Sequence, residues 1–180
     1  MTEFLLEFWR ALYFLISPYA ANAIPPLVKG KTPIDAGKNF LDGKRILGNG
    51  KTWEGFVAGT LFGTFCGSVA WLFYTHLNTI AKEYGFTLPY ISPFNAFLLS
   101  IGALFGDMLG SFIKRRLSME RGSPAPLLDQ LDFIFGAFAV GMFITDVNLF
   151  TFLWCVIITP IVHILANLLA YVCRIKEVPW

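Results

Sequence analysis

Charged residues are scarce in this chain. Asp, Glu, Lys and Arg make up only 14% of its 180 residues, whereas 56% are hydrophobic and the mean hydropathy is +0.61. A soluble globular domain carries about 25% charged residues, so this scarcity excludes an ordinary soluble protein. The net charge of +2 predicts no nucleic-acid partner, because it is small and the basic residues flank apolar segments instead of forming a free tail.

Cysteine and histidine are also sparse. Cys66, Cys155 and Cys173 all lie in apolar segments without CxxC spacing, which excludes a zinc motif and favours core thiols. His76 and His163 are far apart in the sequence, and no Ser/His/Asp or Cys/His set is present for nucleophilic catalysis. This absence favours a reaction whose nucleophile is already an oxyanion, such as a phosphate that attacks a nucleotide.

Long apolar segments are what the chain has in abundance. A helix that crosses the hydrocarbon core needs about 20 apolar residues, and the sequence contains five such segments. We therefore expect an all-α, polytopic membrane protein in one transmembrane domain over residues 1–180, multi-pass in the cell membrane. The expected spans are residues 4–23, 55–77, 93–113, 131–144 and 149–172. The sequence predicts no oligomeric state.

Two of these segments contain local signals of their own. Pro25 and Pro26 are expected to close the first span, because proline cannot continue a helix. Gly59, Gly63 and Gly67 recur every four residues in the second span, a stripe that permits close helix packing. We interpret this stripe as structural.

The first segment is a candidate signal peptide, because residues 21–23 (Ala-Asn-Ala) resemble a cleavage site after an apolar run. Against this, the segment begins with acidic Glu3 and Glu7 in place of a basic region, and Arg10 and Pro18 interrupt the apolar run. We interpret it as a retained helix on which Glu7 and Arg10, three residues apart, can pair.

Basic residues are distributed asymmetrically between the loops. If successive loops lie on alternate sides of the membrane, one side carries six Lys and Arg in the first loop, four in the third loop and two in the tail. Only Arg10 and Lys82 then lie on the other side of the membrane. The positive-inside rule then predicts an N-terminus outside and a C-terminus in the cytoplasm. The polar loops at about 28–53 and 114–130 are both cytoplasmic in this topology, and we expect them to form the active site.

Asp107 lies inside the third span, where an ionised carboxylate costs about 3 kcal/mol on insertion scales. Ser111 follows one turn later, and Lys114 and Arg115 follow two turns later, so the four form one polar stripe. The structural alternative is a contact between Asp107 and Ser111 beside snorkelling basic residues. The functional reading is a catalytic stripe at the cytoplasmic edge.

Two further carboxylates, Asp129 and Asp132, are three residues apart at the start of the fourth span and can share one helix face. Helix capping is the alternative, most readily for Asp129. Three carboxylates without His or Cys suit a hard cation. We therefore predict that Asp107, Asp129 and Asp132 bind Mg²⁺.

The first loop ends in a glycine-rich segment around Lys51. Its glycines expose backbone N–H groups and its lysine can meet a phosphate, which makes Asn49, Gly50, Lys51 and Thr52 candidates for nucleotide binding. It is not a Walker A loop, because Arg45 stands where the first glycine is required and no strand precedes it. The pattern alone is weak, since such loops are often only solvated.

Together these segments resemble the CTP-dependent phosphatidate cytidylyltransferase family, over residues 20 to 140. The resemblance is carried by Lys51-Thr52-Trp53-Glu54-Gly55, by Gly106-Asp107 with Ser111 and Lys114-Arg115, and by Arg121-Gly122, Pro124-Ala125-Pro126 and Leu127-Leu128-Asp129-Gln130-Leu131-Asp132. Gln130 and Phe133 stand where the bacterial members have Arg and Ser, and the bacterial His-Gly-Gly element is missing. These departures from the bacterial pattern favour the archaeal members of the family. Asn22, Pro25 and the stretch 35–52 resemble those members most.

The resemblance implies transfer of CMP from CTP to an isoprenoid ether lipid phosphate in the bilayer, giving a CDP-activated lipid and pyrophosphate. It implies catalytic roles for Asp107, Asp132, Lys114 and Arg115, and substrate contacts from Arg121. Asn22, Asn39 and Asn49 are further candidates for polar contacts to the nucleotide.

Two alternatives remain at this stage. A CDP-alcohol phosphotransferase would need DGxxAR followed by GxxxDxxxD, and Asp42-Gly43 followed by Lys44-Arg45 does not complete that pattern. A transporter would use Asp107 in an ion pathway, but this alternative assigns no function to the loop around Lys51.

Overall fold

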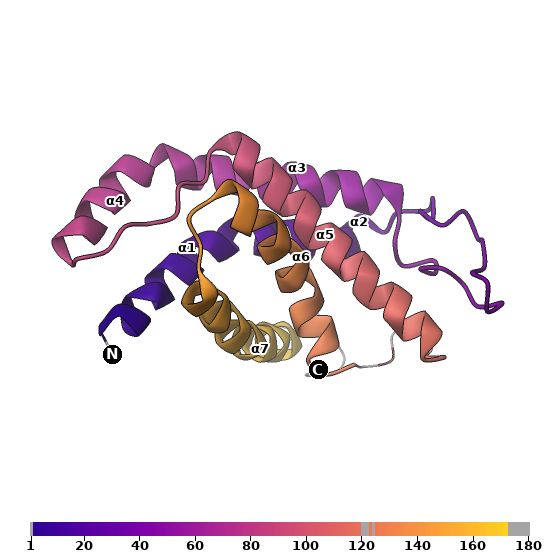
Figure 1. Ribbon diagram of the computed structural model, residues 1–180. Helices are drawn as coiled ribbons and strands as arrows, with labels where there is room; N and C mark the ends of the chain where they lie inside the picture. The colour runs from indigo at the N-terminus through magenta and orange to yellow at the C-terminus, as the bar shows by residue number, and fades with distance from the viewer. Residues whose placement is uncertain (1, 120–122, 124, 173–180) are drawn as a thin grey trace.

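The computed structural model describes residues 2–119, 123 and 125–172 as helices joined by loops. The helices are α1 (Thr2–Ala23), α2 (Pro25–Val28), α3 (Trp53–Leu72), α4 (Tyr74–Glu83), α5 (Pro93–Arg116), α6 (Leu128–Ile144) and α7 (Leu149–Val172). In Figure 1, α3 and α5 run side by side along the molecule, with the loop 29–52 at one end and α4 and the N-terminus at the other. The all-α prediction is confirmed for the described residues.

The apolar segments form helices of the length that a membrane requires. Residues Glu3–Val28, Trp53–Leu72 and Pro93–Arg116 are long and apolar enough to cross a bilayer, and Leu149–Leu165 is a shorter apolar helix. Many large apolar side chains on these helices point outward, for example Phe65, Phe105 and Leu109. An apolar exterior of this kind belongs in lipid, so the chain is a membrane protein.

Small residues let α1, α3 and α5 approach closely. The predicted stripe on α3 is confirmed as a packing surface, because a Cβ on Gly63 would collide with Ser17 of α1 and Ser100 of α5. The buried Ser17 hydroxyl lies 3.0 Å from the Gly63 carbonyl oxygen, 2.9 Å from the Ala96 carbonyl oxygen and 2.9 Å from Ser100 Oγ. Hydroxyls of this kind join helices where no water is available.

A second glycine contact brings α5 and α6 together. Gly102 and Gly106 of α5 face Gly136 of α6 so closely that a Cβ on any of them would collide with the backbone of the other helix. This contact fixes how far α5 and α6 are displaced from each other along their axes. It therefore determines where the acidic residues of α5 and α6 meet.

The first helix ends where the sequence predicts and the second does not. α1 ends at Ala23, before Pro25 and Pro26, and these prolines form the first turn of the separate short helix α2, where a missing N–H is tolerated. The second predicted span, 55–77, divides into α3 and the separate helix α4 at Phe73. The fifth predicted span, 149–172, agrees with α7.

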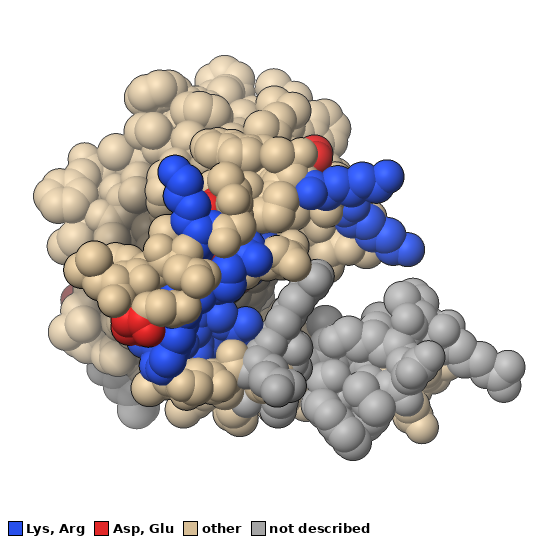
Figure 2. Space-filling model, turned by 90° about the vertical axis from the view of Figure 1, so that its right-hand side faces the viewer, with Lys and Arg blue, Asp and Glu red and all other residues tan. Residues whose placement is uncertain are grey.

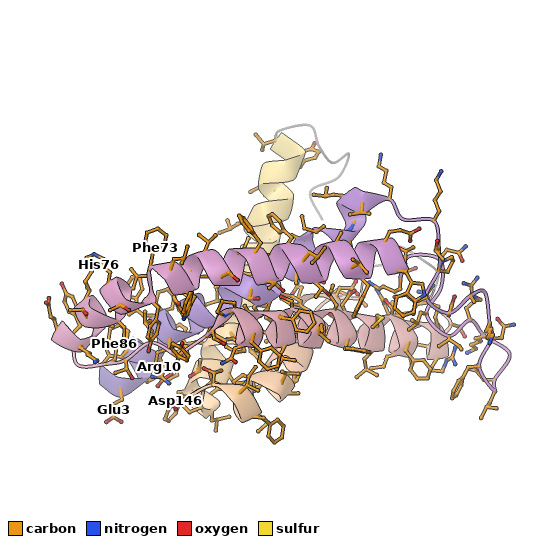
Figure 3. All side chains as sticks on the ribbon, turned by 90° about the horizontal axis from the view of Figure 1, so that it is seen from above. Glu3, Arg10, Phe73, His76, Phe86 and Asp146 are labelled. Carbon is orange, nitrogen blue, oxygen red and sulfur yellow. The ribbon has the colours of Figure 1, made fainter. Side chains whose placement is uncertain are left out.

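A cluster of polar side chains closes the end of the molecule opposite the loop 29–52. The predicted pair of Glu7 and Arg10 is confirmed at 3.1 Å. Arg10, only 6% exposed, also donates to the Thr87 carbonyl oxygen at 2.5 Å and to the Asp146 backbone, and forms an ion pair with the Asp146 carboxylate at 3.2 Å. Figure 3 shows Arg10 and Asp146 at this end. These contacts join α1 to two loops.

Candidate active site

The first loop and the third predicted span meet in an ion pair. Lys51 Nζ, at the end of the loop, lies 2.5 Å from Asp107 Oδ2 on α5. The backbone leads Lys51 to this position because Thr52 caps α3, accepting a hydrogen bond from the Gly55 N–H at 3.2 Å. The carboxylate in the span is therefore neutralised by a lysine that is 56 residues away in the sequence.

Asp132 of α6 lies over a glycine of α5. A Cβ on Gly110 would collide with the Asp132 carboxyl group, so the absence of a side chain at Gly110 makes room for it. Asp132 is 9% exposed, its Oδ1 accepts the Phe133 N–H at 2.7 Å, and it lies within electrostatic range of Asp107 and Lys51. Two carboxylates from neighbouring helices and one ammonium group therefore form one cluster.

Asp129 is paired with a different lysine, although it too lies within electrostatic range of Asp132. Lys114 Nζ lies 2.5 Å from Asp129 Oδ1, and Asp129 Oδ2 accepts the Ala125 N–H at 3.0 Å. The carboxylate thus binds a backbone N–H group just before α6, but α6 has no side-chain cap, so the capping alternative is not confirmed. The residue at the N-cap position of α6 is Leu127.

A small, open cavity lies beside the pair of Lys51 and Asp107, between the end of the first loop, α3 and α5. Its lining contains both polar and apolar residues. They are Gly50, Lys51, Thr52 and Asp107, together with Pro25, Ile34, Phe56, Leu104 and Met108.

The first loop is folded around the carboxylate of Asp35. This side chain has 0% exposure and lies 2.7 Å from Arg45 Nη2. It accepts backbone N–H groups from Gly48 at 2.8 Å, Leu47 at 3.0 Å and Gly37 at 3.1 Å. Burial by itself raises the pKa of Asp35, but the Arg45 guanidinium and these N–H groups hold that pKa well below its ordinary value.

The same loop is docked on the end of α5. The Arg116 guanidinium lies over the rings of Phe40 and Phe112, 5.0 and 4.7 Å from their centroids. It also forms an ion pair with Asp42 at 3.2 Å, while Lys44 Nζ donates to the Arg116 carbonyl oxygen at 2.8 Å. These contacts give the loop a defined place over the acidic cluster.

Most of the exposed charged side chains at this end of the molecule are basic. Figure 2 views the end that carries the loop 29–52 and shows groups of Lys and Arg side chains with few acidic side chains among them. A surface of this charge attracts polyanions such as nucleotides. The asymmetry predicted from the sequence thus corresponds to one face of the folded chain.

The structure places the other predicted residues as follows. Arg115 lies beside the first loop, because a Cβ on Gly48 would be 3.8 Å from Arg115 Nη1. Ser111 is buried on α5, Asn39 and Asn49 are exposed in the loop, and Asn22 is half-buried at the end of α1. Arg121 lies outside the described residues. Their contacts with substrate stay predictions.

Metal binding was predicted from three carboxylates together. Within the part of the chain that the structure describes, no three His, Cys, Asp or Glu side chains form a group that could hold a metal ion. Asp107 and Asp132 alone remain as a pair of oxygen donors next to the cavity, and oxygen donors fit a hard cation. The Asp129 carboxylate is engaged with Lys114 and Ala125.

Sequence reasoning gave no role to Asp35 or Arg116, which organise the loop, or to Gly110, which accommodates Asp132. The glycines at 102, 106 and 110 recur every four residues, as those of the α3 stripe do. That spacing was the available signal for the close contact of α5 and α6.

Comparison with known proteins assigns this fold to a group of enzymes. A family model described as CarS-like CDP-archaeol synthase matches residues 2–180. A protein named CDP-archaeol synthase from Methanocaldococcus jannaschii is 43% identical to this chain, and the match covers 96% of this chain and 97% of that protein. A protein of the same name from Pyrobaculum islandicum is 45% identical, and the match covers 94% of this chain and 98% of that protein. A solved structure of an intramembrane enzyme for archaeal membrane lipid biosynthesis superposes with a TM-score of 0.74 at 37% identity, covering 87% of this chain and 92% of that one.

Proposed function

This chain belongs to the CDP-archaeol synthase family, and we propose that Asp107, Asp132 and Lys51 are the centre of its active site. As a member it is a CTP-dependent cytidylyltransferase that acts on an archaeol lipid phosphate in the membrane and forms CDP-archaeol. The observation that carries the proposal is the ion pair of Lys51 and Asp107 beside a cavity that both polar and apolar residues line.

The proposed reaction needs positioning and charge neutralisation more than proton transfer. An oxyanion of the lipid phosphate forms a bond to the α-phosphorus of CTP, and the bond from that phosphorus to the bridging oxygen of the β-phosphate breaks, so pyrophosphate leaves with its electron pair. The nucleophile is already deprotonated at neutral pH. This agrees with a cluster made of carboxylates and lysines.

Cationic side chains bind the phosphates in this scheme. Lys51 meets the triphosphate, assisted by the backbone N–H groups of the glycines around it, and Lys114 and Arg115 meet the phosphates from the end of α5. The apolar residues that line the cavity receive the lipid next to its head group. Thr52, Ser111, Arg121 and the asparagines at 22, 39 and 49 are proposed as further substrate contacts.

The two carboxylates of the cluster are proposed to hold Mg²⁺, because they are hard oxygen donors from neighbouring helices. A bound divalent cation would neutralise negative charge on the triphosphate. Without substrate, the ammonium group of Lys51 neutralises Asp107. Asp129 supports the site by positioning Lys114.

The membrane topology is proposed to have five spans, with the N-terminus outside and the C-terminus in the cytoplasm. Both basic loops, 28–53 and 114–130, then face the compartment that contains CTP, and the single domain lies in the cell membrane as a multi-pass protein. The exposed basic face at the end that carries these loops supports this orientation. A transporter with Asp107 in its pathway and a CDP-alcohol phosphotransferase have no support from the named relatives.

The direct test uses detergent-purified protein with CTP, Mg²⁺ and an isoprenoid ether glycerol phosphate. We expect CDP-lipid and pyrophosphate in equal amounts, and less product from a diacylglycerol phosphate. Asp132→Asn and Asp107→Asn should lower turnover at least about 100-fold, as loss of electrostatic stabilisation at a transition state does. Glu83→Gln, which removes an exposed acid from α4, is the matched control; full activity in Asp132→Asn would contradict the proposal.

A further inference from the structure

We propose that Asp35 is a positioning residue for CTP binding, acting through the backbone of Lys51. The inference rests on the proposed role of Lys51 and adds a residue with no assigned role. Asp35 does not line the cavity, although its neighbour Ile34 does. Its influence must therefore be transmitted through the loop.

The carboxylate of Asp35 occupies the centre of the loop. Both of its oxygens are engaged: Oδ1 with Arg45 Nη2 and the Gly37 N–H, and Oδ2 with Arg45 Nε and the N–H groups of Leu47 and Gly48. Because the side chain has no exposed surface, losing these contacts would leave several buried polar groups unsatisfied. The loop has more than twenty residues and no regular secondary structure. The hydrogen bonds of the buried Asp35 carboxylate therefore hold the loop in one conformation.

Both backbone groups of Lys51 are bonded to residues that Asp35 holds or adjoins. The Lys51 N–H donates to the Gly48 carbonyl oxygen at 3.4 Å, and the N–H of the same glycine is bonded to Asp35. The Lys51 carbonyl oxygen accepts from the N–H of Ile34, the residue before Asp35, at 2.9 Å. Two successive hydrogen bonds through Gly48 therefore connect the Asp35 carboxylate to the backbone of Lys51, whose side chain forms the ion pair with Asp107.

Asp42 provides a contrast within the same loop. Its carboxylate accepts the Lys44 N–H at 3.0 Å and pairs with Arg116, and its side chain is 35% exposed. It carries the same charge as Asp35 but has no bond to the segment 47–51. A change at Asp42 therefore alters the charge of the loop without releasing Lys51.

The experiment is a double-mutant cycle on detergent-purified protein, with kcat/KM for CTP measured in four proteins: wild type, Asp35→Ala, Lys51→Ala and the double variant. Misplacing a binding group by about 1 Å can cost about 100-fold, so we expect Asp35→Ala to lower kcat/KM at least about 10-fold, mainly through KM. In the Lys51→Ala background the same change should cost less than about 3-fold, because residues that act through one another are not additive. Asp35→Asn replaces Asp35→Ala in the cycle if the alanine variant does not fold.

Hydrogen exchange of the loop amides provides a readout that does not depend on turnover. The amides of Leu47, Gly48 and Lys51 should exchange faster in Asp35→Asn than in wild type, and at the wild-type rate in Asp42→Asn, which should also keep kcat/KM within about 2-fold. Additive effects of Asp35 and Lys51, or unchanged exchange in Asp35→Asn, would overturn the inference. Wild-type protein that forms no CDP-lipid would instead overturn the proposed function.

Discussion

At the scale of single residues, the acidic side chains of this chain have different tasks although their chemistry is the same. Asp107 and Asp132 lie together near a cavity, Asp129 supports the start of α6 and Asp35 is buried in a loop. The difference comes from their partners. Asp107 has one lysine partner, which substrate can replace, and this suits a binding site. The Asp35 carboxylate accepts five hydrogen bonds, and this suits a structural role.

The lowered pKa of Asp35 predicts a dependence of stability on pH. Because its pKa is lower in the folded chain than in the unfolded chain, the ionised carboxylate favours folding above pH 4, and this contribution disappears as the pH falls toward the folded-state pKa. We expect the thermal midpoint of Asp35→Asn to lie below that of wild type at pH 7, and the difference to shrink between pH 5 and pH 3. A difference that stays constant over this range would contradict the prediction.

At the scale of elements, glycines decide which polar groups meet. The contacts of Gly102, Gly106 and Gly136 bring the axes of α5 and α6 close together, and Gly110 leaves the space that the Asp132 carboxyl group fills. Close contact of this kind is how membrane helices associate when the surrounding lipid is as apolar as their side chains. The position of one carboxylate of the proposed site therefore depends on a residue without a side chain.

A methyl group at Gly110 should damage the site more than the fold. In Gly110→Ala the new Cβ would collide with the Asp132 side chain, and overpacking of this kind costs about 1–3 kcal/mol. We expect a lower thermal midpoint and at least about 10-fold lower CDP-lipid formation, since a displaced carboxylate no longer stabilises charge. The control is Leu109→Ala, a larger change in volume at a neighbouring position that is 59% exposed, and it should keep both quantities near wild type.

At the scale of the whole molecule, the two ends are different. One end bears the loop 29–52 and a basic face, and the other bears α4 and the cluster around Arg10 that joins α1 to two loops. Apolar side chains are exposed along the helices between these ends. In the proposed topology, this arrangement places the proposed site at one edge of the bilayer, where a water-soluble and a lipid substrate can meet.

Cysteine labelling tests the proposed topology. In a background with Cys66, Cys155 and Cys173 replaced by alanine, Lys38→Cys lies in the exposed first loop and Glu83→Cys at the exposed end of α4. An impermeant maleimide should label Glu83→Cys on intact cells, and Lys38→Cys only after the cells are permeabilised. The reverse pattern would contradict the orientation with the N-terminus outside.

Several features could be read from the order of residues because they depend on neighbours in the chain. The apolar segments and their helical character, the stripe on α3, the pair of Glu7 and Arg10 and the bounds of α7 all depend on residues a few positions apart. The end of α1 before Pro25 belongs to the same group. The break at Phe73 was missed, because a single residue separates α3 from α4 and neither proline nor glycine marks it.

Amino-acid sequence by itself therefore determined that this is a helical membrane protein with an acidic and basic cluster near two polar loops. Only the tertiary structure decided which charges are partners: Lys51 with Asp107, Lys114 with Asp129, Arg45 with Asp35 and Arg116 with Asp42. The physical reason is that helical periodicity places residues on one face of one helix. Contacts between a loop and a helix depend on the close packing of whole helices, which local spacing does not specify.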